Sequence, residues 1–430
     1  MRALFKSGLM SLVLATLLLL ALTATGAAQK TVIVHMHDVS HEPEWLEWLR
    51  AAKDRFEALH PDIEIQFLTE TRPSLNEKLV VLWGAGEHPD VIEVLPSEHY
   101  YFALRGMFRD LRPYFEQDQD LDRNDFFPLA VEAATIIEGH PGSGQMWMMP
   151  ASIWVTGAAV NDTHFAEAGL LPPSRLDHQW TWEEFAESGK KLTRIDGDGS
   201  ISRYGVGLQT YIYWIRNAGG EIFDRMVDPT RTTVNAPPVY RALEFLQDAV
   251  VRSEYALRTT GLMDFATERI SIFMHGGPST TQFVRNSGAD WEWSYAANPA
   301  DVKGGSEIVT LGFAMSSQAK NPDATWQWMK FLVTEMAADH IAYTGRPGAW
   351  GPVAQDYFSY FQDPTEWEQV WIDLINHPDT YNRLVAAPEV VNTLNSYIGQ
   401  VLDGQAAPEV VMSGAVDHLN AIIAANRLTR

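Results

Sequence analysis

The chain has 430 residues, of which 46% are hydrophobic and 20% charged, and its formal net charge at pH 7 is −23. This composition fits a globular protein with sizeable cores, and the length predicts two or three domains. The acidic balance argues against nucleic acid or an anionic lipid surface as a partner, because clustered lysine and arginine bind both.

The first 28 residues differ from the rest of the chain. Arg2 and Lys6 precede an apolar run from Leu9 to Leu22, and small residues follow up to Ala28. This pattern predicts a secretory signal peptide at residues 1–28, with an uncleaved membrane anchor as the alternative. A spanning helix needs about 20 apolar residues, whereas this run has 14.

The chain contains no cysteine. An exported protein of this size therefore folds without disulfides, which suits a periplasm-type compartment. A lipid attached through cysteine is also excluded, so we expect a periplasmic protein with no direct lipid anchor.

An alternation of strands and helices follows the signal peptide. Apolar and β-branched patterns predict strands at residues 31–37, 63–70 and 91–96, and amphipathic patterns predict helices at 42–62 and 74–90. Strand, helix, strand, helix, strand indicates a parallel sheet with helices packed on it.

Residues 181–192 are predicted to form a capped helix. Thr181 and Glu184 have the spacing of a capping box, in which two side chains satisfy free backbone N–H groups. The adjacent Glu183 and Glu184 point about 100° apart on a helix, so they do not flank one bond as catalytic pairs do. The buried stripe is expected at Trp182, Phe185 and Leu192.

The turn that follows, Asp196 to Gly199, has some features of a calcium loop. An EF-hand beginning at Asp196 would need glycine at its sixth position and glutamate at its twelfth, but Ile201 and Gly207 stand there. We interpret it as a solvated turn, because aspartate and glycine both tolerate turn geometry, and leave a bound cation as the alternative.

The remaining elements continue the alternating pattern. A short run at residues 145–150 ends at Pro150, and helices dominate from residue 321 onward. Further strands are predicted at residues 155–161, 204–210, 270–275 and 308–316, and helices at 321–335 and 407–426.

Several segments, taken in order, carry a resemblance to a known family: "PDVIEVLP", "WIRNAGGEIFD", "SIFMHGGPS", "GFAMSSQAKNPDATWQWMKFLVTE" and "LDGQAAPEVVMSGAVDHLNAIIAAN". Together they resemble the family 1 extracellular solute-binding proteins of bacterial ABC importers, which are similar to maltose- and trehalose-binding proteins. The resemblance implies an α/β, two-lobed periplasmic-binding-protein fold of type II, with discontinuous lobes and three hinge crossings. It places the N-lobe at residues 29–150 plus 310–350 and the C-lobe at 151–308 plus 351–430.

The function implied is that of a receptor without catalysis. Its lobes would close on a mono- or oligosaccharide and deliver it to the membrane subunits of an ABC permease, and we expect a monomer with no cofactor and no metal. A polyol, a glycerol phosphate or another small polar solute is the alternative ligand. A secreted carbohydrate-active enzyme is less favoured, because the sequence has no short motif that indicates paired catalytic carboxylates or an activated nucleophile.

The resemblance also implies ligand-binding positions in the N-lobe and at the first hinge. They are Asp38, His41, Ser97, Glu98 and Trp154. Capping of the next helix is the alternative role of Asp38. A zinc site is a second alternative for this region, because His35 and His37 share a strand face close to Asp38 and His41.

The C-lobe and the third crossing are expected to supply the other ligand-binding positions. They are Gln209, Tyr211, Trp214, Gly277, Pro278, Gly312, Arg346 and Trp350. Core packing is the alternative role of Tyr211 and Trp214. Many relatives continue the glycine-proline turn with tryptophan, whereas Ser279 follows Pro278 here. The content of 15 Trp and 14 Tyr suits sugar recognition, because C–H groups on a sugar face pack on aromatic rings.

Overall fold

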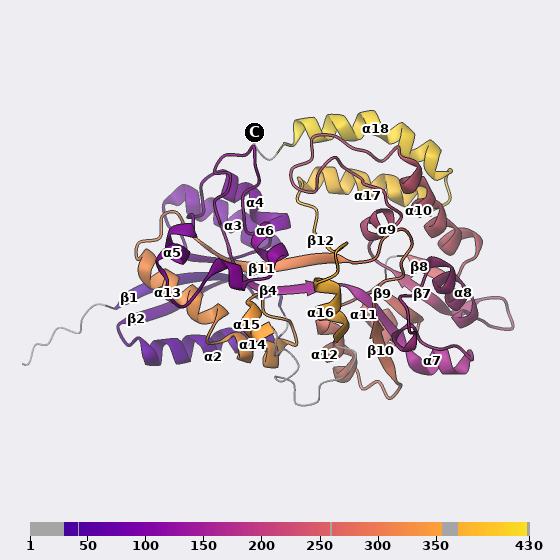
Figure 1. Cartoon of the computed structure of the whole chain (residues 1–430), viewed down its shortest axis with the longest axis horizontal. Coiled ribbons are helices and arrows are strands. Elements are labelled where there is room, and N and C mark those ends of the chain that lie inside the picture. The colour runs from indigo at the N-terminus through magenta and orange to yellow at the C-terminus, as the bar shows by residue number, and fades with distance from the viewer. Residues whose placement is uncertain (1–29, 42, 259, 355–368, 428–430) are drawn as a thin grey trace, which may run out of the picture.

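The computed structural model describes residues 30–41, 43–258, 260–354 and 369–427. The predicted signal peptide at residues 1–28 lies outside this part of the chain. Figure 1 shows two lobes side by side, each with its own sheet surrounded by helices, and strands β11 and β4 run between them. The predicted α/β two-lobed fold class is confirmed.

The first lobe is built on a six-stranded sheet of order β12-β11-β3-β1-β2, with β4 paired to β11. β1 pairs in parallel with β2 and β3, whereas β11 runs antiparallel to β3 and β4. The strands are β1 (Thr31–Asp38), β2 (Ile63–Glu70), β3 (Val91–Val94), β4 (Met149–Val155), β11 (Glu307–Met315) and β12 (Tyr381–Asn382).

The second lobe is built on a six-stranded sheet of order β10-β5-β9-β7-β6, with β8 paired to β7. β7 is parallel to β8 and β9, and β5 is antiparallel to β9 and β10. The strands are β5 (Gly157–Asn161), β6 (Arg194–Ile195), β7 (Ile201–Leu208), β8 (Ala256–Arg258), β9 (Ile270–Gly276) and β10 (Trp293–Ala296).

Helices from two separate parts of the chain surround the first sheet. They are α2 (Pro43–Leu59), α3 (Arg72–Ala85), α4 (Pro96–Leu104), α5 (Arg112–Gln117), η1 (Arg123–Asp125), α6 (Pro128–Ala133), α13 (Pro322–Val333), α14 (Ala337–Thr344) and α15 (Gly351–Ala354). α16 (Gln369–Ile375) contacts β4 between the lobes.

The helices of the second lobe include the last two of the described chain, which pack on each other and on α10. The elements are α7 (Asp162–Glu167), η2 (Pro173–Arg175), α8 (Trp182–Leu192), α9 (Ile212–Asn217), α10 (Pro237–Gln247), η3 (Asp248–Arg252), α11 (Leu262–Ala266), α12 (Pro278–Asn286), α17 (Pro388–Leu402) and α18 (Pro408–Ala425). No helix of the described chain has the length and apolar character needed to cross a bilayer.

Most predicted elements agree with the structure to within a few residues. The main departure is β4, which passes through Pro150 instead of ending there. The strand register shifts where Pro150 lies opposite Gly312. Proline has no backbone N–H group to donate to a neighbouring strand. At such an irregularity the regular pattern of backbone hydrogen bonds is already interrupted, so proline is tolerated there. The predicted lobe boundary at residues 150 and 151 therefore falls inside one strand and stays a prediction.

The predicted capping box of α8 is confirmed. Glu184 N donates to Thr181 Oγ1 over 3.2 Å, and Thr181 N donates to Glu184 Oε2 over 2.7 Å. In the turn that follows, Asp198 Oδ1 accepts a hydrogen bond of 2.9 Å from Ser200 N, and Gly199 has φ +85°. The aspartate is engaged within its own turn, as the solvated-turn interpretation requires.

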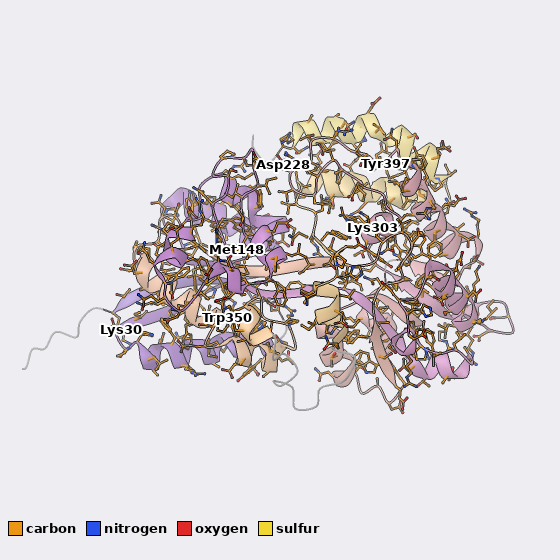
Figure 2. The ribbon with its side chains drawn as sticks, in the orientation of Figure 1. Lys30, Met148, Asp228, Lys303, Trp350 and Tyr397 are labelled. Carbon is orange, nitrogen blue, oxygen red and sulfur yellow. The ribbon has the colours of Figure 1, made fainter. Side chains whose placement is uncertain are left out.

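A buried carboxylate joins the two lobes. Asp228, in the second-lobe segment after α9, accepts a hydrogen bond of 3.0 Å from His140 Nε2 of the first lobe. Arg427 Nε donates to both carboxylate oxygens over 3.1 and 3.0 Å, and Arg225 Nε donates to the backbone carbonyl of Asp228 over 2.8 Å. Figure 2 shows Asp228 at the top of the molecule, between the lobes.

Three buried histidines of the first lobe are kept neutral by their surroundings. Burial lowers the pKa of His35 and of His340 to about 3, and that of His99 to about 4. Protonation of any of these histidines therefore favours the unfolded state.

We expect the free energy of unfolding to fall as the pH is lowered from about 6.5 to about 4. The unfolded chain takes up protons on these histidines near pH 6.5, whereas the folded chain does not until about pH 3 to 4. The slope should reach about 1.4 kcal/mol per pH unit for each histidine. Urea midpoints measured between pH 7 and pH 4 test this.

The substitution His340→Phe should flatten this dependence while preserving an aromatic ring against Trp45 and Trp48. His178→Ala is the matched control. Its side-chain hydrogen bonds with Asp177 and Glu184 raise the pKa of His178, so removing this exposed imidazole should not flatten the slope. An unchanged slope in His340→Phe would show that the buried imidazole contributes nothing to the pH dependence.

Candidate binding cleft

The carboxyl ends of strands from both sheets meet at one cavity between the lobes. Ser97 follows β3 in the first lobe, Gln209 follows β7 in the second, and His275 lies near the end of β9. All three line a cavity of about 680 Å³, called here the wide cavity. In open α/β sheets, ligands bind beyond the carboxyl ends of the strands, so this is the expected position of a site.

Two arginines on the wall of the wide cavity are paired with acids. Arg383 Nε donates to Glu307 Oε1 over 2.7 Å, and both residues line the cavity. Arg258 donates to Asp403 Oδ1 over 2.5 Å and to the carbonyl oxygen of Gly399 over 3.1 Å. These pairs leave the wall polar, with its positive charges already neutralised.

A second, narrower cavity of about 310 Å³ adjoins the first. Gln209 and His275 line both cavities, so they stand at the junction. Beyond them, the narrow cavity is bounded by Trp154 and Arg346. The guanidinium carbon of Arg346 lies 5.2 Å from the centre of the Trp154 ring, a cation–π contact. A ligand in this cavity therefore meets a positioned aromatic ring.

His275 presents an uncharged polar group at the junction. Its Nδ1 atom is buried and has no hydrogen-bond partner among the described residues. Burial, and then the nearby positive charge of Arg383, lower the pKa of His275 to about 4. At neutral pH the imidazole is thus neutral, with one nitrogen able to donate and the other to accept. Leaving such an atom unpaired is unfavourable, and a hydroxyl group would satisfy it.

A third cavity of about 790 Å³, called here the mouth, continues the cleft past Ser97, which it shares with the wide cavity. Arg72 and Glu98 line the mouth. Arg72 Nε lies 2.7 Å from Asp38 Oδ2, and Arg72 NH2 donates to Glu93 Oε1 over 3.2 Å. The arginine therefore connects the end of β1 to β3.

His41 completes this cluster, because its Nε2 atom lies 2.6 Å from Glu93 Oε1. Burial alone would raise the pKa of Glu93, but His41 and Arg72 together lower it to about 2. Burial raises the pKa of Glu98, against the opposing effect of Arg72.

Within the described chain, Asp38, His41 and Glu93 form the one group whose ligand atoms suit a metal, all within 4.8 Å of one another. The Arg72 guanidinium already forms ion pairs with Asp38 and Glu93. It therefore supplies positive charge to these two carboxylates without a metal ion.

The structure brings together seven of the positions expected from the sequence. Ser97, Gln209 and Tyr211 line the wide cavity, and Glu98 joins Ser97 in the mouth. Trp154, Gln209, Gly277 and Arg346 line the narrow cavity. Asp38 and His41 contact Arg72 but do not themselves line these cavities.

Four other expected positions lie elsewhere. Trp214 is fully buried in the second-lobe core, in ring contact with Phe185, so its ring does not reach the cleft surface. At Gly312, a Cβ atom would lie 2.4 Å from the Met149 carbonyl oxygen, so the close approach is to β4 and not to a cavity. Trp350 lies on the first lobe beside Phe126 (Figure 2). Pro278 begins α12, and its side chain lies outside the described part.

Several cavity residues were missed by the sequence analysis. The most informative are His275, Arg383 and Asn395. His275 is the last residue of the predicted strand at 270–275, and this position at a strand end is a signal that the sequence does contain. Arg383 and Asn395 come from β12 to α17, far along the chain, where no local pattern indicates that they return to the cleft.

Comparisons with known proteins fit this geometry. The family model described as "Bacterial extracellular solute-binding protein" matches residues 40–339. A curated relative, an uncharacterized lipoprotein in the oleD 5′ region of Streptomyces antibioticus, is 26% identical over an alignment of 306 residues that covers 67% of this chain and 64% of that protein. The match thus spans less than two thirds of the relative's length.

Solved structures show the same fold. An ABC substrate-binding protein from Listeria monocytogenes in complex with cycloalternan has a TM-score of 0.76 at 21% identity, covering 92% of this chain and 99% of that one. A cyclic α-maltosyl-1,6-maltose binding protein from Arthrobacter globiformis has a TM-score of 0.75 at 19% identity, with coverages of 92% and 99%. UgpB from Mycobacterium tuberculosis in complex with glycerophosphocholine has a TM-score of 0.76 at 16% identity, again with coverages of 92% and 99%.

Proposed function

Because this chain belongs to the bacterial extracellular solute-binding protein family, we propose that it is the receptor of an ABC importer for a carbohydrate. The ligand would bind between the lobes, which close on it and deliver it unchanged to the permease. One observation carries the proposal: neutral polar groups, above all Gln209 and His275, stand at the centre of an interlobe cleft beside Trp154.

The electrostatics of the cleft support an uncharged ligand. Arg383 and Arg258 are paired with Glu307 and Asp403, so their charge is already balanced. A ligand rich in hydroxyl groups can bond to His275 Nδ1 and still pack its C–H face on an aromatic ring. Two of the similar structures carry carbohydrates in their descriptions, which also supports this class.

A glycerol-phosphate-type solute is the alternative ligand. The similarity to UgpB, described in complex with glycerophosphocholine, favours it, as does the presence of Arg346 in the narrow cavity. To bind a phosphate directly, Arg346 would have to give up its present contacts. Its guanidinium group lies over the Trp154 ring. The carbohydrate therefore remains the better-supported proposal.

The remaining parts of the proposal concern location and partners. The protein would be exported to a periplasm-type compartment, act as a monomer without catalysis or cofactor, and bind permease subunits through both lobes. The absence of cysteine from the printed sequence supports an anchor-free form. The lobes would comprise residues 29–150 plus 310–350 and residues 151–308 plus 351–430.

A thermal-shift panel of mono- and oligosaccharides, polyols and glycerol phosphates tests the ligand class. A ligand at 100 times its dissociation constant should stabilise the protein by about 2.7 kcal/mol. We expect a sugar to raise the melting temperature, and Trp154→Ala to reduce that increase. A shift with glycerophosphocholine and none with any sugar would overturn the carbohydrate proposal in favour of the alternative.

A further inference from the structure

The three cavities of the cleft form one continuous groove. The mouth and the wide cavity share Ser97, and the wide and narrow cavities share Gln209 and His275. The groove therefore runs from the charged residues Arg72 and Glu98 to Trp154. A ligand at the junction has room on both sides.

The two inner cavities differ in size and in chemistry. The narrow one, about 310 Å³, lies at the lower limit of the roughly 300 to 1,000 Å³ usual for small-molecule sites. Two aromatic residues, Trp154 and Phe273, are among those that line it. The wide one, about 680 Å³, is lined by hydrogen-bonding groups that include Asn392 and Asn395.

Asn392 and Asn395 project from α17 at helical spacing and are both exposed. Residues three apart lie on the same face of a helix, and this face is turned toward the wide cavity. A monosaccharide in the narrow cavity would leave these amides without ligand contact. A second unit would reach them after passing Gln209 and His275.

We propose that the ligand of this cleft is an oligosaccharide of two or more units that spans the junction at Gln209 and His275. One terminal unit packs against Trp154 in the narrow cavity, and the next binds the amides of α17 in the wide cavity. Further units extend past Ser97 toward the mouth, which is open to solvent. This inference rests on the proposed carbohydrate function and specifies the size of its ligand.

Calorimetric titration of the purified protein with sugars of increasing length tests the proposal. The probes are glucose, maltose and maltotriose; mannose, mannobiose and mannotriose; and xylose, xylobiose and xylotriose. In the series that binds, we expect the two- or three-unit sugar to bind at least about tenfold more tightly than the single unit, since each added hydrogen bond contributes about three- to tenfold.

Variants at the two ends of the junction locate the units. Asn395→Ala should weaken binding of the longer sugar about three- to tenfold and leave the affinity for the monosaccharide unchanged, whereas Trp154→Ala should weaken both. Ser396→Ala, next to Asn395 on α17 and also exposed, is the matched control and should change neither affinity. Asn395 is exposed, so its replacement should leave the urea midpoint unchanged.

The outcomes separate this inference from the proposed function. A monosaccharide that binds as tightly as its longer relatives, or an Asn395→Ala variant with unchanged affinity for the longer sugar, would overturn the inference and leave a sugar receptor. Binding of glycerophosphocholine, with no sugar bound in any series, would overturn the carbohydrate function and the inference together.

Discussion

Replacing Asp228 with alanine is expected to lower the free energy of unfolding by about 3 kcal/mol or more, because removing one partner of a buried ion pair typically costs about 3 to 5 kcal/mol. The Asp228 side chain is 2% exposed and that of Arg427, its charged partner, is 26% exposed. The His140 side chain, which also contacts this carboxylate, is 1% exposed. Without the carboxylate, the buried imidazole and the Arg427 guanidinium would lose their shared acceptor. Urea unfolding followed by tryptophan fluorescence measures the loss.

Two variants separate the charge from other effects of this substitution. Asp228→Asn retains a side chain that tolerates the left-handed backbone at this position, where φ is +46°, and should therefore be less destabilising than alanine. Glu167→Ala removes an exposed partner of Arg203 and should cost only about 0 to 1 kcal/mol. If Asp228→Ala is no more harmful than Glu167→Ala, the interlobe cluster does not contribute to stability.

Much of the fold could be predicted because its signals are local. The predicted helix at residues 181–192 agrees with α8, since the Thr181 capping box fixes its first turn. The predicted strand at residues 63–70 coincides with β2. The path of β4 through Pro150 could not be predicted, because it depends on a register shift against Gly312, which is more than 150 residues away in the chain.

Part of the candidate site could be predicted because it follows a strand. Ser97 and Gln209 lie just after β3 and β7, and the rule that ligands bind at carboxyl ends of strands finds them. The same rule would have selected His275. Trp214 was expected from a family resemblance, but its place on α9 buries it completely in the core, a contact with residues distant in sequence. Asn395 needs the same long-range information, because α17 reaches the cleft only through the second-lobe packing.

Removal of the Trp328 side chain should strongly destabilise the first lobe. Trp328→Ala is expected to lower the free energy of unfolding by about 3 to 5 kcal/mol, the usual cost of emptying a buried aromatic site. The residue is fully buried in α13, and its ring centre lies 5.1 Å from that of Phe56 in α2. Its Nε1 atom donates to His35 Nδ1 over 3.2 Å.

The size of this effect follows from how the first lobe is assembled. Phe56 and His35 belong to the first part of the chain, whereas Trp328 follows all the strands of the second sheet in the sequence. The indole therefore attaches a returning segment to β1 and α2. Trp328→Phe should retain most of the ring packing and lose the hydrogen bond to His35, so its loss should be smaller. Trp83→Ala, at a partly exposed site on α3, should also cost less. Equal losses for Trp328→Ala and Trp83→Ala in urea unfolding would mean that the returning segment is not anchored through this indole.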